Sequence, residues 1–369
     1  MTEQRRIDFK TGYPDLALVP RDLLLAITTD LLRENRGMQY AGDVAGSQPA
    51  REQIAAMLHE LYGIPVQTNE LILTTGALAS IDIVCRALTS PDDVVIVESP
   101  TFYFAVTIIE ACRVQIVSVP MGHDGINLSA LELALRQYGS RVKVVYTIPA
   151  FHNPTGICAT VENRRGLIAL ARQYGFTILE DATYQPLYFE SPPPPLIQSL
   201  DDSGRVATVA SVSKLIMPAL RLGWIYAPAD KIALYKRGKA DGASSLLSSE
   251  IVASFAERGE FLPQVERARA LYKRKHHAMV SALDRYAPAW LEWDAPNGGY
   301  FVWAKVPPHV SVKALLGRAN TLGVDFFAGS ASFVDGNDDS HLRLCFALMS
   351  EDEIEQGIAR LSEALHEFM

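Results

Sequence analysis

The stretch VATVASVSKLIMPALRLGW spans residues 206–224 and guides the interpretation of the whole chain. Its first part, VATVASV, is rich in β-branched and small residues without polar alternation, which is typical of a strand that is buried on both faces of a parallel sheet. Such a strand delivers Lys214 to the carboxyl end of the sheet, where parallel α/β sheets bind their ligands. The stretch therefore predicts an α/β fold with a lysine at the ligand-binding edge.

Groups that bind anions surround Lys214 in the sequence. Ser211 and Ser213 precede it, and Arg221 follows seven positions later. Hydroxyl and guanidinium groups both bind phosphate oxygens, and a lysine that loses its proton by desolvation becomes a nucleophile toward a carbonyl. Together these groups suggest an aldehyde that carries a phosphate, namely pyridoxal 5′-phosphate. Taken alone, the SxSK motif fits a solvated surface loop equally well, because short motifs match by chance.

The composition is that of an ordinary folded chain. Its 369 residues are 49% hydrophobic and 21% charged, enough for one large domain and a smaller one. Acidic residues outnumber basic ones by 42 to 34, and this net charge of -8 argues against a nucleic-acid partner. The four cysteines have no CxxC spacing, so neither a metal site nor a disulfide framework is expected. Without a signal-like or membrane-spanning apolar run, we expect a cytoplasmic protein.

Apolar runs alternate with helical periods from about residue 70, in the order ELILTTG, GALASIDIVCRAL, DVVIVES, TFYFAVTIIEAC, RVQIVSV, KVVYTIP, ENRRGLIALARQYG and FTILEDATY. This alternation predicts a mostly parallel sheet covered by helices on both faces. Beyond residue 229 the pattern is helical, and it then turns at 296–299 into the alternating strand YFVWAKV. We expect an N-terminal leader over residues 1–40 that joins the small domain, a large domain over 41–260 and a small α+β domain over 261–369.

Three loops at the ends of predicted strands carry candidate ligand-binding residues. Gly76 and Ala77 open a helix whose free N–H groups suit a phosphate. Phe102 offers a ring that could stack on a flat heteroaromatic ligand, and the Asn153 amide could donate to a phenolate oxygen. Each position also has a plain structural explanation: a helix N-cap, a core aromatic and a turn former, respectively.

A fourth loop follows FTIL and carries Asp181 and Tyr184. A carboxylate at the end of an apolar strand is costly to bury without a partner. A pyridinium nitrogen is such a partner, and Asp181 would keep that nitrogen protonated and strengthen the ring as an electron sink. Tyr184 could reach the phenolate. A lone aspartate at a strand end is more often a helix N-cap, so the pairing matters more than the residue.

These motifs occur together in one known order. NPTG at 153–156, the Asp-x-x-Tyr of Asp181 and Tyr184, and SxSK with its later arginine follow one another with about the spacing found in fold-type I pyridoxal-phosphate enzymes. Over essentially its whole length the chain resembles class I/II aminotransferases. The stretches VESPTFYFAV, FHNPTG and PALRLGW are most similar to the 2-aminoadipate/kynurenine aminotransferase-like branch. The resemblance implies the pyridoxal-phosphate-dependent transferase fold of type I.

The resemblance also implies a role for each candidate residue. Lys214 would form the Schiff base with the cofactor and move the substrate proton, with Asp181 and Tyr184 as the other catalytic residues. Arg343 would bind the substrate α-carboxylate. Asn153 would contact both cofactor and substrate, Gly12 would let the substrate approach closely, and Phe102 would stack on the ring. The phosphate would be held by Gly76, Ala77, Ser211, Ser213 and Arg221, with Tyr40 reaching it from a neighbouring subunit.

Three positions depart from the family pattern. Phe102 stands where the family usually has tyrosine, Phe327-Ala328-Gly329-Ser330 replaces a Val/Leu-Pro-Gly turn, and Tyr300 follows Gly-Gly where methionine is frequent. We expect these positions, with Tyr300 among them, to line the substrate side of the pocket. They leave the cofactor assignment intact and the identity of the substrate open.

The predicted function is a pyridoxal-phosphate-dependent aminotransferase that acts on an α-amino acid and a 2-oxo acid with ping-pong kinetics. The same residues would also serve β- or γ-elimination, replacement, or an oxidative or decarboxylating reaction on an activated amino acid. A DNA-binding regulator is disfavoured by the short leader and acidic charge, and an NAD-binding protein by the lack of GxGxxG after the early strands. We expect a homodimer that shares its active sites between subunits.

Overall fold

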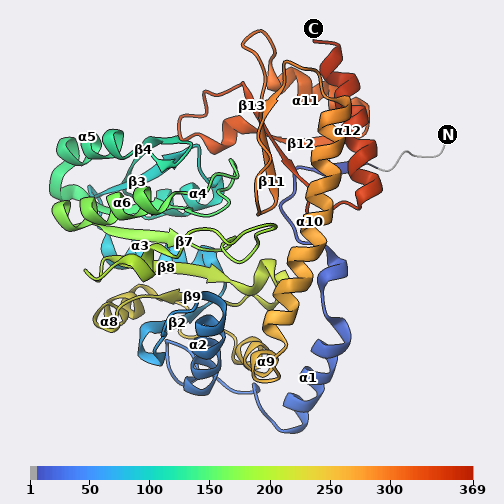
Figure 1. Ribbon diagram of the computed structural model, residues 1–369. Coiled ribbons are helices and arrows are strands. Elements are labelled where there is room, and N and C mark those ends of the chain that lie inside the picture. The colour runs from blue at the N-terminus through green and yellow to red at the C-terminus, as the bar shows by residue number, and fades with distance from the viewer. Residues whose placement is uncertain (1–5, 369) are drawn as a thin grey trace.

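The computed structural model describes residues 6–368 and contains two β-sheets (Figure 1). The first five residues of the predicted leader lie outside this range. The larger sheet has eight strands in the order β2-β9-β8-β7-β6-β3-β4-β5. In that order the strands are Leu71–Thr74, Gly223–Tyr226, Val206–Ser211, Thr177–Asp181, Val142–Thr147, Val94–Ser99, Gln115–Gly122 and Gly125–Ile126. Strands β4, β3, β6, β7 and β8 run parallel to one another, which confirms the predicted mostly parallel sheet.

Strand β9 runs in the opposite direction to these strands and pairs antiparallel with both β8 and β2. The alternation of apolar runs did not predict this reversal. The connection from β8 to β9 contains only the two short 3-10 turns Val212–Lys214 and Pro218–Leu220. A parallel pairing needs a longer crossover, so the chain doubles back instead. Lys214 therefore lies in a tight connection that both of its flanking strands hold in place.

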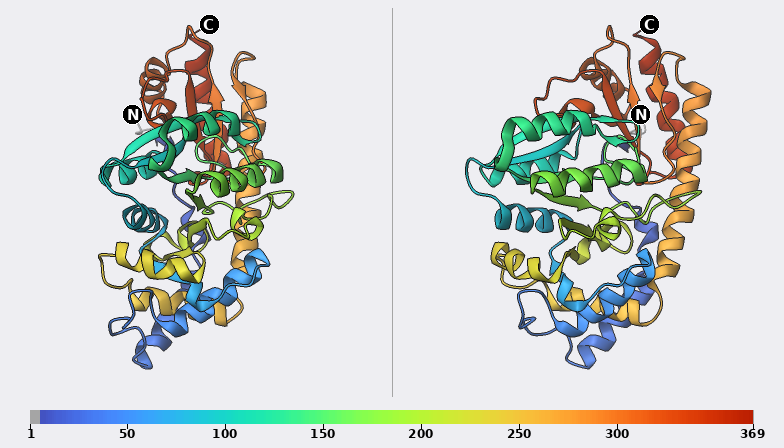
Figure 2. Two further views of the ribbon diagram at one scale, coloured as in Figure 1. Left: turned by 90° about the vertical axis from the view of Figure 1, so that its left-hand side faces the viewer. Right: turned by 60° about the vertical axis from the view of Figure 1, so that its left-hand side comes forward.

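Alternating residues of the large sheet supply two separate cores. In β3, Val95 and Val97 pack in one core with α3 (Ala77–Leu88), α4 (Tyr103–Ala111) and α8 (Ala229–Gly238). Val94 and Ile96 pack in the other with α5 (Leu128–Tyr138), α6 (Val161–Tyr174) and the short α7 (Ile197–Leu200). Strand residues alternate between faces, so a strand apolar throughout needs helices on both sides. Figure 2 shows these helices on the two faces.

The smaller sheet has five strands in the order β1-β12-β13-β11-β10. In that order they are Ile7–Phe9, Val324–Ala328, His341–Cys345, Phe301–Lys305 and Glu292–Trp293. Strand β1, from the start of the chain, pairs in parallel with β12 near its end. The small sheet thus holds the segment after β1 at the place where the two sheets meet.

The remaining helices join the two sheets in one large hydrophobic cluster. They are α1 (Arg21–Arg33), α2 (Gln48–Tyr62), α9 (Leu246–Glu257), α10 (Phe261–Tyr286), α11 (Val312–Thr321) and α12 (Glu351–His366). The long α10 runs from α9 to the small sheet and packs on α12 (Figure 1). Helix α2 ends at Gly63, which has a φ of 68° in the left-handed region that favours glycine. Between residues 6 and 368 no helix has both the length and the apolar character needed to cross a membrane.

Candidate active site

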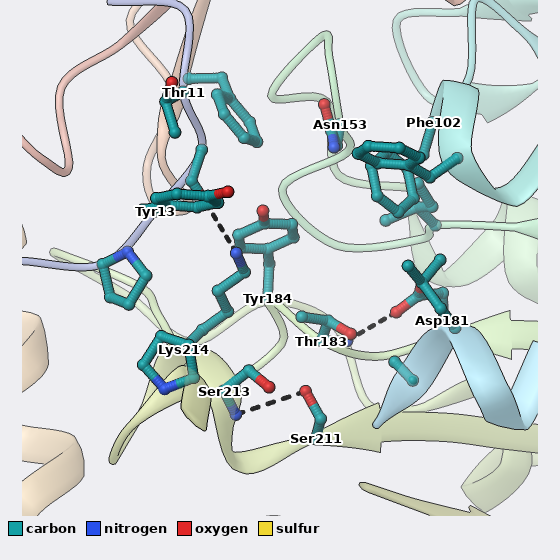
Figure 3. A pocket seen from close by; sticks show the side chains of 18 of the residues that line it. Thr11, Tyr13, Phe102, Asn153, Asp181, Thr183, Tyr184, Ser211, Ser213 and Lys214 are labelled. Carbon is teal, nitrogen blue, oxygen red and sulfur yellow. Dashed lines mark hydrogen bonds between the residues drawn. The ribbon is translucent and has the colours of Figure 1, made fainter. Parts of the chain in front are cut away.

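A cavity of about 380 Å³ lies at the carboxyl ends of β6, β7 and β8, which is the ligand-binding edge of a parallel sheet (Figure 3). It brings together most of the residues that the sequence singled out. Those that line it are Gly12, Ala77, Phe102, Asn153, Asp181, Tyr184, Ser211, Ser213, Lys214, Arg221 and Arg343. Among residues 6–368, the candidates that do not line it are Tyr40, Gly76 and Tyr300.

Lys214 directs its amine into this cavity. Its Nζ donates a hydrogen bond to the carbonyl oxygen of Gly12 at 2.7 Å. Burial, together with the nearby Arg343, lowers the pKa of Lys214 from its ordinary value of 10.5 to about 8, while Asp181 opposes the shift. A larger fraction of this amine is therefore uncharged near neutral pH than in an exposed lysine, which makes it a better nucleophile and base.

Asp181 ends β7 and is only 5% exposed. One carboxylate oxygen accepts the backbone N–H of Thr183 at 3.0 Å, and the other accepts the hydroxyl of Tyr146 at 3.1 Å. Burial raises the pKa of Asp181, although these hydrogen bonds oppose the shift. A cationic partner in the cavity would compensate for the cost of burying this carboxylate. Tyr146 was not among the predicted site residues.

Tyr184 is buried. The rings of Tyr300 and Phe301 pack edge-on against its ring, with ring centres 5.4 and 5.7 Å from that of Tyr184. Burial raises the pKa of its hydroxyl, so the group stays protonated over the physiological range. A protonated hydroxyl in this position can donate a hydrogen bond to an anionic oxygen.

Arg343, in β13, is 4% exposed and lies between two aromatic rings, 4.2 Å from the centre of Phe301 and 4.4 Å from that of Phe327. Its Nη1 donates to Asn153 Oδ1 and its Nη2 to the carbonyl oxygen of Lys10, both at 2.8 Å. Its Nε has no hydrogen-bond partner among residues 6–368. This buried and incompletely paired guanidinium fits a carboxylate ligand.

The contact with Arg343 fixes the orientation of the Asn153 amide. A guanidinium can only donate, so the oxygen of Asn153 must face Arg343. The NH₂ group is then turned the other way and is available as a donor. Asn153 lines the cavity, where Figure 3 shows its side chain.

The part of the cavity formed by the start of α3 and the connection from β8 to β9 has the composition of a phosphate-binding site. Ala77 begins the 12-residue helix α3, and Ser211, Ser213 and Arg221 lie nearby in the lining. Gly76 has a φ of 102°, and a Cβ atom here would lie 2.7 Å from Nη2 of Arg221, so glycine is required for the arginine to approach. Helix N–H groups, hydroxyls and a guanidinium are phosphate donors. Together with a buried carboxylate and a lysine, these residues fit pyridoxal phosphate.

The lining also contains residues that the sequence did not single out, and four of them are Thr11, Tyr13, Tyr103 and Phe104. These four are neighbours of predicted ones, in KTGYP beside Gly12 and in PTFYF beside Phe102. The aromatic content of these two stretches was the available signal. The ring of Tyr103 stacks on that of Phe327, with centres 5.2 Å apart.

Tyr300 differs from the expectation that it lines the substrate side. It is completely buried, and its hydroxyl donates to the backbone carbonyl of Lys214 at 3.1 Å. Through this hydrogen bond Tyr300 supports the turn that carries Lys214. Of the segment 327–330, only Phe327 reaches the cavity lining in the described chain. Tyr40 lies outside the lining and is 98% exposed.

Comparison with known proteins identifies the family of the chain. The family model described as aminotransferase class I and II matches residues 7–361. The chain belongs to this family. This aminotransferase is 32% identical to aromatic-amino-acid aminotransferase 1 of Thermococcus litoralis, over 98% of the present chain and 88% of the relative.

Two solved structures extend the comparison. The multiple substrate aminotransferase of Thermococcus profundus superimposes with a TM-score of 0.94 at 30% identity, covering 100% of this chain and 93% of that one. The α-aminoadipate aminotransferase LysN of Thermus thermophilus superimposes with a TM-score of 0.91 at 29% identity, covering 98% of this chain and 92% of that one. That structure is a complex with N-(5′-phosphopyridoxyl)-L-leucine, in which cofactor and amino acid are joined.

This chain is therefore a pyridoxal-phosphate-dependent aminotransferase of fold type I that acts on amino acids. The predicted cofactor and reaction class are confirmed. Family membership favours transamination over the elimination, replacement and decarboxylation that the motifs alone left open.

Proposed function

We propose that this aminotransferase prefers α-amino acids with an aromatic or large apolar side chain and passes their amino group to a 2-oxo acid. Seven of the 23 residues that line the cavity are aromatic, namely Tyr13, Phe102, Tyr103, Phe104, Tyr184, Phe301 and Phe327. The arginines that line it within the described chain are Arg221, at the phosphate end, and Arg343. Arg343 suits the α-carboxylate, so a second carboxylate on the substrate would find no further guanidinium among the lining residues of the described chain. The name of the aromatic-amino-acid relative supports the same preference.

The residues around the cofactor have distinct proposed tasks. When bound, pyridoxal phosphate supplies an aldehyde that condenses with amines and a ring that accepts electrons. Asp181 holds a proton on the ring nitrogen, since a buried carboxylate stabilises the cation beside it. The Asn153 amide and the Tyr184 hydroxyl would donate to the phenolate oxygen. Phe102 would stack on the cofactor ring.

Lys214 and Arg343 act on the substrate. Arg343 holds the α-carboxylate through paired hydrogen bonds, which fixes the direction of the Cα–H bond. Lys214 Nζ takes the proton from Cα, and its lowered pKa allows it to start in the uncharged form. The buried rings of Phe301 and Phe327 beside Arg343 shield this side of the cavity from water.

The observation that carries the proposal is the presence of Lys214, Asp181 and Arg343 in a single cavity with aromatic walls. The test incubates the holoenzyme with a panel of amino acids and follows both the absorbance of the bound cofactor and the masses of the products. Phenylalanine, tyrosine and tryptophan should convert fastest and give one equivalent each of 2-oxo acid and pyridoxamine phosphate. Release of ammonia, or a preference for aspartate and glutamate, would contradict the proposal.

A homodimer is part of the proposal. Tyr13 and Phe104 line the cavity but are 65% and 47% exposed, and Tyr40 in its glycine-rich loop is 98% exposed. A second copy that covers this side would bury these rings and bring its own Tyr40 toward the phosphate. Light scattering should give twice the mass of the chain, and a fully active monomer would rule the arrangement out.

We further propose that the enzyme works in the cytoplasm. Its four cysteines, Cys85, Cys112, Cys158 and Cys345, are all free thiols, which suits a reducing compartment. Recovery of the native enzyme in a periplasmic or secreted fraction would contradict this location.

A further inference from the structure

A second buried carboxylate lies next to the cavity, and none of the proposed steps uses it. Glu98, near the end of β3, is 1% exposed. One of its oxygens accepts the hydroxyl of Thr147 at 2.5 Å, and the other accepts the backbone N–H of Ile148 at 2.9 Å. The latter oxygen also lies 3.2 Å from Nε2 of the fully buried His152. Thr147 and Ile148 mark the end of β6, so Glu98 ties this strand end to β3.

The surroundings of His152 determine which ring nitrogen carries its proton. The backbone N–H of Thr155 points at Nδ1 at 3.4 Å, and the Thr155 hydroxyl lies 2.9 Å from the same atom. That hydroxyl already accepts the N–H of Ile157, which leaves its own proton free for Nδ1. Nδ1 is thus an acceptor, and the proton of the neutral ring lies on Nε2, facing Glu98. The ring is an acceptor from the loop, and its Nε2 side faces the carboxylate at 3.2 Å without the alignment of a hydrogen bond.

This pair joins two loops that carry the cofactor residues. Glu98 leads into the loop that ends with Phe102, and His152 directly precedes Asn153. Strands β3 and β6 are neighbours in the sheet, which brings the two loops together. The backbone of His152 is also fixed, because its N–H donates to Ile157 and its carbonyl accepts the N–H of Gly156. The 3.2 Å contact with Glu98 adds a side-chain restraint to this backbone and so restricts the orientation of the residue just before Asn153.

We propose that Glu98 and His152 are a positioning pair that orients Asn153, an inference that rests on the proposed role of Asn153 at the phenolate oxygen. Asn153 has two partners to satisfy at once, with its oxygen on Arg343 and its NH₂ toward the cofactor. A small rotation of the loop would weaken both contacts, because hydrogen bonds weaken steeply with angle. The pair thereby couples the geometry of the cofactor ring to that of the carboxylate-binding arginine.

Glu180 provides a matched control. It is fully buried, lies in β7 one residue before Asp181, and accepts the hydroxyl of Thr208 and the backbone N–H of Ile197 at 2.7 Å each. Its environment thus resembles that of Glu98, but its bonds lead to α7 and not to the NPTG loop. Glu180→Gln and Glu98→Gln remove the same charge from similar sites.

The test measures the pH midpoint of the visible absorption of the bound cofactor and the KM for the amino acid. A hydrogen bond to the phenolate oxygen stabilises its anionic form, so losing it raises the midpoint. Glu98→Gln and His152→Ala should each raise the midpoint by about 0.7 pH unit, the equivalent of one neutral hydrogen bond, and should raise the KM about fivefold. His152→Gln, which keeps a donor for Glu98, should recover part of both changes, and it carries the test if Glu98→Gln does not fold.

Asn153→Ala separates the two possible failures. If it raises the midpoint while Glu98→Gln and His152→Ala leave it unchanged, the positioning pair is wrong and the role of Asn153 stands. If Asn153→Ala itself leaves the midpoint unchanged, the proposed role of Asn153 is wrong, and so is the proposal that Glu98 and His152 position it. An equal shift in Glu180→Gln would show that any buried carboxylate has this effect, which also overturns the proposal.

Discussion

Replacing Arg343 by lysine keeps the positive charge and removes the geometry that the structure assigns to it. The guanidinium lies between the rings of Phe301 and Phe327 and donates from two nitrogens to Asn153 and Lys10. A lysine ammonium is a point charge that can neither stack on both rings nor form two parallel bonds to a carboxylate. The substitution thus isolates the contribution of the planar fork.

The expected loss follows from two contacts. A hydrogen bond to a charged group contributes about 1.5–3 kcal/mol, and a desolvated cation–π contact about 2 kcal/mol, of which lysine retains part. A loss of about 3 kcal/mol in transition-state binding corresponds to a fall in kcat/KM of roughly 150-fold. Most of the effect should appear as a higher KM, because the α-carboxylate is held equally in ground and transition states.

Steady-state kinetics with an aromatic donor measures this effect. Arg318→Lys is the control: Arg318 lies on the surface, pairs with Glu367 and is remote from the cavity lining, so its replacement should change kcat/KM less than twofold. If Arg343→Lys kept kcat/KM within about threefold of the native value, the assignment of Arg343 as the carboxylate ligand would be refuted.

Three further predictions concern the cofactor. Because burial lowers the pKa of Lys214 to about 8, capture of pyridoxal phosphate by the apoenzyme should speed up with rising pH and level off above about 8; a rate that keeps rising toward 10.5 would contradict the shift. Asp181→Asn should lower kcat about 100- to 1,000-fold with a smaller change in KM, because the charge that holds the ring proton is lost; stopped-flow half-reactions measure this, and an unchanged kcat would count against the role. Tyr40→Phe should leave the dimer intact by light scattering and weaken cofactor binding about fivefold in a fluorescence titration, the cost of one hydrogen bond; unchanged affinity would show that Tyr40 does not reach the phosphate.

The fold and the polar residues at the centre of the site were largely predictable, because they follow from rules that act along the chain. Apolar runs alternating with helical periods predict a parallel sheet, and a parallel sheet places the ends of its strands at one edge. Asp181, Lys214 and Asn153 each follow such a run, so their meeting in one cavity could be inferred before any contact was known.

The partners of these residues could not be predicted in the same way. The bonds from Tyr146 to Asp181 and from Arg343 to Asn153 depend on the three-dimensional packing of strands and loops, which sequence patterns do not specify. The same holds for Tyr300, whose place after Gly-Gly indicates a turn but not that its hydroxyl meets the backbone of Lys214. The reversal of β9 depends on loop length and not on any apolar pattern.

The central claim is that Lys214 Nζ binds the cofactor aldehyde. Reduction of the holoenzyme with borohydride, followed by proteolysis and peptide mass spectrometry, tests it most directly. The phosphopyridoxyl group should be found on Lys214 in the native enzyme and on no peptide of Lys214→Ala. Its recovery on another lysine of the native enzyme, or undiminished labelling of Lys214→Ala, would contradict the account.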